Sequence, residues 1–396
     1  MTDVNKIEFG EYSQANEIKL VQSGTAYFNL LKKLIEEAID TIHLQVYIFE
    51  NDSTGAEIAN ALIQAAARGV KVYVIIDGYA SKKWPEEVRN LFRETGVNFR
   101  RFEPLLKNRY FYFGRRLHHK VLVVDGCKAL VGGINIGDRY NDMPGLKAWF
   151  DVALYVYGEV AIELEDICVR LWNKSYGNIT QAVVTPYEIC RQRIAKVDSK
   201  VSVRVRRNDW VKIKNEIWKS YFNMFNHATN SITIVCSYFM PGWKYRQAIN
   251  NATKRGVKVK VVLAGRSDVM LSKYAERYLY RWMFNNNIKV YEYDRNVLHA
   301  KMAVQDEKWV TVGSYNVNEI SASASIELNL DVRNRPFAKT VHDLAETIID
   351  RDCRQISKET YNTFSSAFRW VLHLCAYYIV RLMLFAVTFY YKKERD

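Results

Sequence analysis

The segment LHHKVLVVD at positions 117–125 recurs as LHAKMAVQD at positions 298–306. Both copies place Lys two positions after His, and Asp five positions after Lys. A turn of small residues follows each copy, GGIN at 132–135 and GSYN at 313–316. The spacing from His to Asn is 17 positions in both places (118 to 135 and 299 to 316). Agreement at so many positions indicates an internal duplication of the chain.

The apolar, valine-rich composition of both segments predicts two β-strands bounded by polar turns. Side chains alternate between the faces of a strand, so His118 and Lys120 are expected to point the same way. The same argument pairs His299 with Lys301.

The remaining motif positions have two expected roles. An odd offset from the histidines places the two aspartates on the other face, as structural residues at strand ends. The small residues after the strands let backbone approach a ligand, and the asparagines that close the turns supply amide donors. These positions are Asp125, Asp306, Gly132, Gly133, Gly313, Ser314, Asn135 and Asn316.

Histidine beside lysine and asparagine suits phosphate chemistry. An imidazole can attack phosphorus or deliver a proton. Ammonium and amide donors can neutralise and orient phosphate oxygens. Neither half of the chain contains both a nucleophile and an acid, but the two halves together do.

The duplication extends beyond the motif. ARGVKVYVIIDG at 67–78 matches KRGVKVKVVLAG at 254–265, and IHLQVYIF at 42–49 resembles ITIVCSYF at 232–239. Strands alternating with helices predict an α/β fold in which each repeat is a mixed β-sheet flanked by helices. A pseudo-twofold axis between the repeats would place His118 opposite His299 in one cleft. The expected domains are an N-terminal repeat over 1–195, a C-terminal repeat over 196–363 and a hydrophobic or amphipathic tail over 364–396.

The paired His-x-Lys-x4-Asp pattern resembles the phospholipase D superfamily, over most of residues 17–335. Within it, the chain is similar to bacterial cardiolipin synthases of the short form that lacks N-terminal membrane helices. Segments VYIFEND (46–52), IDGY (76–79), SYFMP (237–241) and ELN (327–329) support that similarity. In the family an acidic residue downstream of each catalytic strand orients the histidine. Asp151 and Glu327 occupy those positions.

The resemblance implies a double displacement. One histidine forms a phosphohistidine, while the other protonates the leaving alcohol and then deprotonates the acceptor. His118 is expected to be the nucleophile and His299 the acid and base, although pseudo-symmetry leaves the order open. The carboxylates of Asp151 and Glu327 would fix the imidazole tautomers.

Charge on phosphorus would be stabilised by Lys120, Lys301, Asn135 and Asn316. Exchange of one phosphodiester for another requires no metal and no cofactor. The implied substrates are phospholipids, phosphatidylglycerol or phosphatidylethanolamine, and the product is cardiolipin. Nucleic acid is not expected as a partner, and a homodimer is left open.

Composition agrees with a membrane-surface enzyme. The 57 Lys and Arg against 43 Asp and Glu give a net charge of +14, which favours an anionic partner, either an acidic membrane surface or nucleic acid. Six scattered cysteines without a C-x-x-C pair indicate reduced thiols on the cytosolic side. The start of the sequence is polar and lacks the apolar core of a signal peptide. The expected location is the cytoplasmic side of the bacterial inner membrane.

Aromatic and basic residues interleave over positions 100–116, just before the first motif, and suit a bilayer interface and phosphate headgroups. Nucleic-acid stacking and a buried loop are the alternatives. The residues expected to contact lipid here are Phe102, Leu105, Leu106, Tyr110, Phe111, Tyr112, Phe113, Arg115 and Arg116.

The tail from 364 to 391 is long enough to span a bilayer, but charges interrupt it. Arg369, His373, Tyr377 and Arg381 recur every four residues and form one helical face. This pattern predicts an anchor lying in the membrane plane, with Trp370 and Arg381 in contact with lipid. A spanning helix is the second interpretation, and packing against the core or a second subunit is the third.

Three functions remain in competition. The first is a phosphatidyltransferase that makes cardiolipin. The second is a hydrolase of the same superfamily, either a phospholipase D or a nuclease. The third, a non-catalytic lipid-binding protein, is disfavoured because every motif residue is present in both halves.

Overall fold

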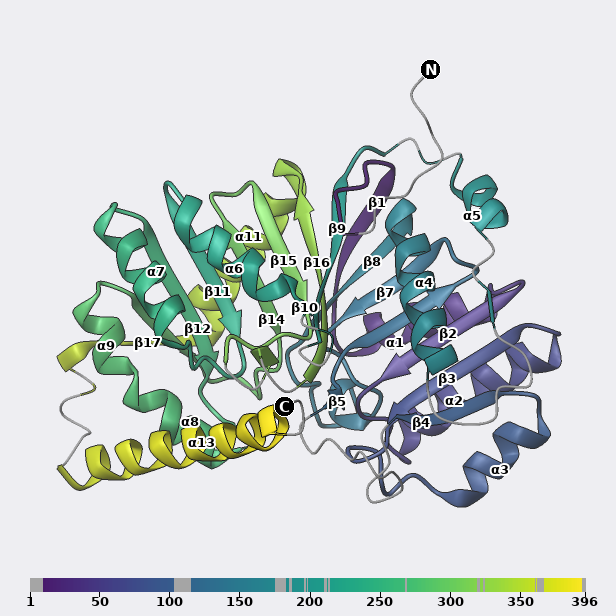
Figure 1. Ribbon diagram of the computed structural model, residues 1–396, viewed down its shortest axis with the longest axis horizontal. Helices are drawn as coiled ribbons and strands as arrows, with labels where there is room; N and C mark the ends of the chain where they lie inside the picture. The colour runs from purple at the N-terminus through teal and green to yellow at the C-terminus, as the bar shows by residue number, and fades with distance from the viewer. Residues whose placement is uncertain are drawn as a thin grey trace.

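The computed structural model of the 396-residue chain describes residues 10–393 except 103–114, 175–182, 185–186, 196, 198, 210–211, 213, 268, 319–320, 323–324, 360 and 362–366. The chain forms two lobes side by side, each built on its own sheet (Figure 1). In the described residues, the first sheet has seven strands in the order β1-β8-β7-β6-β2-β3-β4. The second has ten, in the order β10-β9-β16-β15-β14-β11-β12-β13-β17, with β5 joined to β16.

The strands of the N-terminal lobe are β1 (Asn16–Gln22), β2 (Thr41–Val46), β3 (Lys71–Asp77), β4 (Asn98–Phe102), β6 (Lys120–Val124), β7 (Lys128–Gly132) and β8 (Val152–Gly158). Its helices are α1 (Thr25–Glu36), α2 (Ser53–Ala67), α3 (Glu86–Glu94), η1 (Asp138–Tyr140), α4 (Glu159–Lys174) and α5 (Tyr187–Ile194). The short strand β5 (Arg116–Leu117) leaves this lobe to pair with the other one.

The C-terminal lobe contains β9 (Ser202–Asp209), β10 (Lys214–Asn215), β11 (Ser231–Cys236), β12 (Lys258–Ala264), β13 (Lys289–Tyr293), β14 (Lys301–Gln305), β15 (Trp309–Gly313), β16 (Ser325–Arg333) and β17 (Cys353–Ile356). Its helices are α6 (Glu216–His227), α7 (Trp243–Lys254), α8 (Met270–Tyr278), α9 (Tyr280–Asn285), α11 (Arg335–Asp352) and α13 (Ala367–Lys393).

The duplication is visible in the strand order. β8-β7-β6-β2-β3-β4 in one lobe corresponds to β16-β15-β14-β11-β12-β13 in the other. In both, two parallel pairings are joined to antiparallel ones through the motif strand, since β6 runs antiparallel to β2 and β14 antiparallel to β11. The predicted α/β fold of two mixed sheets flanked by helices is confirmed.

Both motif aspartates turn away from the histidines and hold the starts of neighbouring strands. Asp125 has a positive φ of 52°, and its carboxylate accepts hydrogen bonds from the backbone N–H groups of residues 39, 40 and 41, where β2 begins. Asp306, with φ 51°, does the same for residues 229, 230 and 231 before β11. Each aspartate therefore ties the end of its motif strand to the strand beside it.

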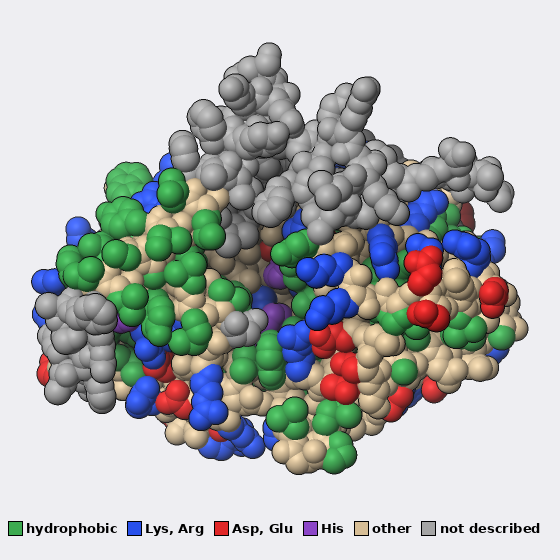
Figure 2. Space-filling view, turned by 90° about the horizontal axis from the view of Figure 1, so that it is seen from below, with side chains coloured by type: hydrophobic (Ala, Val, Ile, Leu, Met, Phe, Trp, Pro, Cys, Tyr) green, Lys and Arg blue, Asp and Glu red, His purple; other side chains and the backbone are tan. Residues whose placement is uncertain are grey.

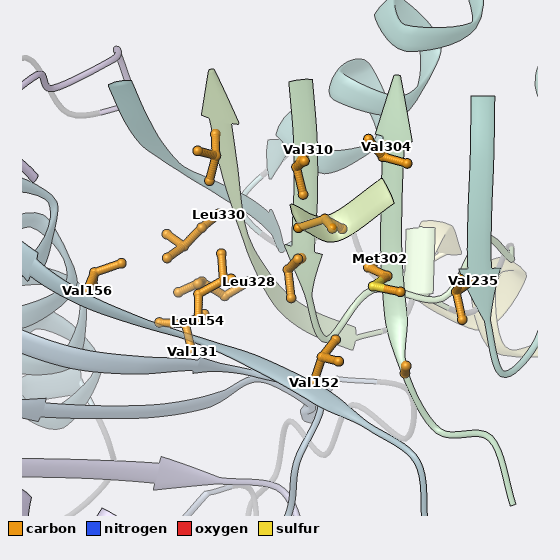
Figure 3. Close-up of a cluster of buried hydrophobic side chains, with 14 of the residues drawn as sticks. Val131, Val152, Leu154, Val156, Val235, Met302, Val304, Val310, Leu328 and Leu330 are labelled. Carbon is orange, nitrogen blue, oxygen red and sulfur yellow. The ribbon is translucent and has the colours of Figure 1, made fainter. Parts of the chain in front are cut away.

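A large hydrophobic core joins the lobes. β7 and β8 of the N-terminal lobe contribute Val131, Val152 and Leu154, and the second lobe contributes side chains from β14, β15 and β16. Figure 3 shows these residues facing Val310 and Leu328 across the boundary. Helices α4 and α11 close this core, whereas α1 and α2 cover the other face of the first sheet, and α6 and α7 that of the second.

The C-terminal tail forms α13, which lies against α8 along the lower edge of the second lobe (Figure 1). Its packing corresponds to the third sequence interpretation, in which the tail contacts the core. Among the residues that the structure describes, no helix combines the length and apolar character needed to cross a membrane.

Candidate active site

Both motif histidines lie just before their strands, where the chain crosses from one lobe to the other. The backbone N–H of His118 donates to the carbonyl of Ile326 in β16 at 3.0 Å. In the same way, the N–H of His299 donates to the carbonyl of Phe150, next to β8, at 2.7 Å. The prediction that the whole motif is one strand is therefore wrong at its first three residues in each copy, because this backbone bonds to the opposite lobe and the strands begin at Lys120 and Lys301.

Each imidazole is paired with a carboxylate from the other lobe. His118 Nδ1 lies 2.9 Å from Glu327 Oε2, and His299 Nδ1 lies 2.6 Å from Asp151 Oδ2. Both carboxyl groups are fully buried, and both histidine side chains keep some exposure. A carboxylate held at Nδ1 fixes the imidazole tautomer and leaves Nε2 as the nitrogen for chemistry.

The turns after the strands support these carboxylates differently. A Cβ at Gly133 would lie 2.4 Å from Asp151 Oδ1, so only glycine fits against this carboxylate. At the equivalent position, the hydroxyl of Ser314 donates to Glu327 Oε2 at 2.5 Å. Gly132 and Gly313 lie as close to the neighbouring backbone of β8 and β16, where a Cβ would clash within 2.4 Å.

Two lysines extend the site beneath the histidines. Lys120 and Lys301 are buried, and each ammonium donates to the backbone carbonyl of the histidine two residues before it. Lys301 Nζ also donates to Ser237 Oγ at 3.2 Å. Burial lowers the pKa of Lys120 to about 7, against the attraction of Glu327 and with the repulsion of Lys301. Two lysines whose charges act on each other are suited to hold an anion.

The asparagines are buried beside the histidine pairs. Asn135 accepts from the N–H of Ile48 at 3.1 Å and donates to the hydroxyl of Tyr140 at 2.9 Å. Its amide nitrogen carries a second hydrogen beyond the one given to Tyr140. Asn316 has its amide oxygen 3.7 Å from the thiol of Cys236. These contacts fix both amide groups in place.

Aromatic side chains contact both motif histidines. The Tyr47 ring lies edge-on to His118, with centroids 4.8 Å apart, and Lys120 Nζ lies 5.1 Å from the same ring. On the other side, Tyr140 and Trp149 contact His299, with centroids 5.4 and 6.2 Å away. The position of Trp149 two residues before Asp151 is the signal that could have identified it.

The charges of the cleft act on each other across the lobe boundary. Burial lowers the pKa of the His118 imidazole, against the attraction of Glu327, which favours the neutral ring at neutral pH. Burial raises the pKa of Asp151 to about 7, while Lys301, Lys120 and His118 oppose that shift. Charged groups from both copies of the motif therefore shift each other's pKa values within one cleft.

The site opens on the face shown in Figure 2, where histidine side chains lie in a central hollow bordered by Lys and Arg. Within the described part of the chain, no three His, Cys, Asp or Glu side chains are grouped so as to hold a metal ion.

The expected lipid contacts before the first motif have a mixed outcome. Positions 105, 106 and 110–113 lie outside the described residues. The prediction is wrong for Phe102, which is 4% exposed and packs with Leu117 and Ile326. Arg115 and Arg116 are mostly buried against the carboxylates of Asp209 and Asp77. These residues lie at the boundary between the lobes, and their alternation of aromatic and basic side chains resembles that of a lipid-facing surface.

In the tail, Trp370 and Arg381 are exposed. Arg381 lies 5.7 Å from the ring of Tyr377. His373 and Tyr377, the described middle of the predicted polar stripe, are buried against α8. The predicted polar stripe therefore packs against the protein at these two positions.

Comparison with known proteins agrees with this geometry. A family model described as "Cardiolipin synthase, PLD-like domain" matches residues 31–164 and 221–349, one match in each lobe. Proteins named cardiolipin synthase B from Shigella flexneri and Escherichia coli (strain K12) are 31% identical over 88% of this chain and 84% of their own length.

Solved structures share the fold. The crystal structure of phosphatidylserine synthase from Haemophilus influenzae Rd KW20 aligns with a TM-score of 0.70 and 14% identity over 94% of both chains. Polyphosphate kinase from Porphyromonas gingivalis aligns with a TM-score of 0.58 and 14% identity, over 87% of this chain and 49% of the kinase. At these identities the likeness concerns the fold alone. The matches to sequence relatives show that the chain belongs to the cardiolipin synthase family of phospholipase D-like proteins.

Proposed function

We propose that this protein is a phosphatidyltransferase that makes cardiolipin and free glycerol from two molecules of phosphatidylglycerol. The observation that carries the proposal is the pair of histidines, each bonded at Nδ1 to a carboxylate of the other lobe, in a chain of the cardiolipin synthase family. A donor with an ethanolamine headgroup would follow the same chemistry. The anionic surface that supplies these lipids is the cytoplasmic face of the inner membrane.

In the first step, Nε2 of His118 attacks the phosphorus of the donor lipid. The bond from phosphorus to the glycerol headgroup breaks, and Nε2 of His299 gives its proton to the departing alkoxide. The product is a phosphatidyl group on His118 and one free glycerol. The lowered pKa of His118 supports the nucleophilic role, because a neutral ring carries the attacking lone pair.

In the second step, His299 takes the proton from a headgroup hydroxyl of a second phosphatidylglycerol. That oxygen attacks phosphorus, the bond between phosphorus and nitrogen breaks, and His118 is restored. Asp151 stabilises the positive charge that His299 gains. Lys120 and Lys301 hold the phosphate oxygens, and the remaining amide donors of Asn135 and Asn316 orient them.

The direct test uses purified full-length protein and acyl-labelled phosphatidylglycerol in detergent micelles, with the lipids separated afterwards. Labelled cardiolipin with an equal amount of free glycerol supports the proposal. Phosphatidic acid as the main product would identify a hydrolase, and absence of any lipid product would also overturn the proposal.

A covalent trap tests the two histidine roles. The phosphorus–nitrogen bond of a phosphohistidine is expected to survive alkali but not acid. The reaction is therefore quenched with alkali before the label on the protein is measured. His118→Ala should form no labelled protein, whereas His299→Ala should accumulate label slowly and release little cardiolipin. His227→Ala, at the exposed end of α6, is the matched control and should behave as the parent. Label on His118→Ala but not on His299→Ala would reverse the assignment.

A further inference from the structure

α13 is attached to the second lobe by its more polar side. The His373 ring stacks on Tyr274 with centroids 5.7 Å apart, and four residues later Tyr377 contacts Tyr278 at 4.8 Å. Ala376 is buried beside them. Because the contacts advance together along both helices, α13 runs parallel to α8 and is held at a defined angle to the sheet.

The opposite side of α13 is apolar and exposed. Of the sixteen exposed large hydrophobic residues among the described positions, seven lie between 370 and 383. Most of them lie on the side away from α8, and the seven include two aromatic residues with polar ring atoms. They are Trp370, Val371, Leu372, Tyr378, Ile379, Leu382 and Met383.

This surface lies on the face that also contains the catalytic hollow. α13 forms the lower edge of the molecule in Figure 1, and Figure 2 views the molecule from that side. Hydrophobic side chains gather over the C-terminal lobe, next to the hollow with its histidine, Lys and Arg side chains. Met270, at the start of α8, is exposed beside the same helix.

We propose that the outward side of α13 docks into the interface of an anionic phospholipid bilayer, with the helix in the membrane plane. This inference rests on the proposed function, since two lipid substrates must reach the hollow without their acyl chains crossing water. Because α8 fixes α13, docking the helix also turns the hollow toward the lipid surface.

The chemistry of the surface favours an anionic bilayer. Trp370 and Tyr378 have the amphipathic rings that are enriched at membrane interfaces. Arg381 is exposed next to Leu382, and the chain as a whole has a net charge of +14. A spanning arrangement would require α13 to leave α8 and uncover Tyr274 and Tyr278.

The test compares two isoleucine substitutions of the full chain. Ile379→Glu places a carboxylate on the outward side of α13, and Ile39→Glu places one on an exposed isoleucine in the turn between α1 and β2. Binding is measured by flotation with vesicles of phosphatidylglycerol and phosphatidylethanolamine. Ile379→Glu should lower the partition coefficient roughly tenfold or more, because an apolar side chain leaves the interface. Ile39→Glu should bind as the parent, and vesicles without phosphatidylglycerol should bind less of all three proteins.

Three results would overturn the inference: no flotation of the parent protein, equal binding of Ile379→Glu, or equal loss in Ile39→Glu. A parent dimer that Ile379→Glu separates with unchanged vesicle binding would assign the surface to a second copy instead. Activity in detergent micelles, which needs no docking, should be equal in the parent and Ile379→Glu. If the parent floats but makes no cardiolipin in micelles, the proposed function fails while the docking surface stands.

Discussion

Each histidine of the cleft depends on the lobe to which it does not belong. Glu327 bonds His118 and Asp151 bonds His299, so separating the lobes would remove both carboxylates at once. The family resemblance named Asp151 and Glu327 as the residues that orient the histidines of the duplicated motif. It could not predict that the pairs cross, because identical spacing within each copy does not say which copy supplies the carboxylate.

Removing one carboxylate charge should impair catalysis more than folding. Glu327→Gln and Asp151→Asn should each lower the rate of cardiolipin formation by about 10²–10⁴-fold, because the amide favours the wrong imidazole tautomer. The thermal midpoint should change little by comparison. The control is Asp331→Asn, four residues along β16, where a buried carboxylate bonds Arg204 instead of a histidine. This control should lose stability and keep its activity per folded molecule; the reverse pattern would contradict the assigned roles.

A second buried pair gives a prediction about pH. His43 Nε2 lies 3.5 Å from Glu165 Oε1, yet burial lowers the pKa of His43 to about 3 and raises the pKa of Glu165 to about 8. Both groups are therefore uncharged near pH 7, and the contact is not an ion pair. The folded protein holds the Glu165 proton more tightly than the unfolded chain, whose carboxyl has the ordinary value of 4.5.

The contribution of Glu165 to stability should thus be complete below pH 4.5 and be lost as the pH rises through 8. The free energy of unfolding of the parent should fall between pH 5 and 9, and in Glu165→Gln this fall should be smaller by roughly 2–5 kcal/mol. Urea unfolding of both proteins at a series of pH values measures this. Parallel curves for the parent and the variant would show that Glu165 is ionised in the folded protein.

At the scale of single elements, the sequence predicts the motif strands but not the orientation of the C-terminal helix. The motif strands follow from their short, apolar, valine-rich composition. The orientation of α13 cannot be predicted in this way, because a stripe of His and Tyr side chains can lie against the tyrosines of α8 or face water. Only the neighbouring helix decides between these surroundings, and its contacting residues are 99 positions earlier in the sequence (274 to 373 and 278 to 377).

Replacement of the two motif aspartates should lower the free energy of unfolding by different amounts. Asp125→Ala leaves three partly buried backbone N–H groups at the start of β2 without their acceptor, and we expect a loss of about 2–4 kcal/mol. Asp306→Ala exposes the equivalent groups to water and should cost about 1 kcal/mol. Chemical denaturation measures both values, with activity per folded molecule unchanged. Equal losses in the two variants would show that burial does not set the cost.

At the scale of the whole molecule, the lobes share one core although the sequence presents two similar halves. Figure 3 shows Leu154 of β8 beside Leu328 of β16. Sequence comparison of the halves predicts two domains because it detects what they have in common. Contacts between the halves leave no such signal, since a valine facing the other lobe is indistinguishable from one facing its own helices.

This shared core predicts that the lobes unfold together. Leu154→Ala, in the N-terminal lobe, should lower the free energy of unfolding by about 2–5 kcal/mol. Amide hydrogen exchange should accelerate in β15 of the other lobe as much as in β8, because opening the common core exposes both sheets. Leu62→Ala, in α2 on the far face of the first sheet, provides a matched truncation outside that core. It should accelerate exchange in α2 and β2 first and reach β15 only through global unfolding. Faster exchange confined to the N-terminal lobe in Leu154→Ala would mean that the lobes are separate folding units, and that the crossed histidine pairs are maintained by docking alone.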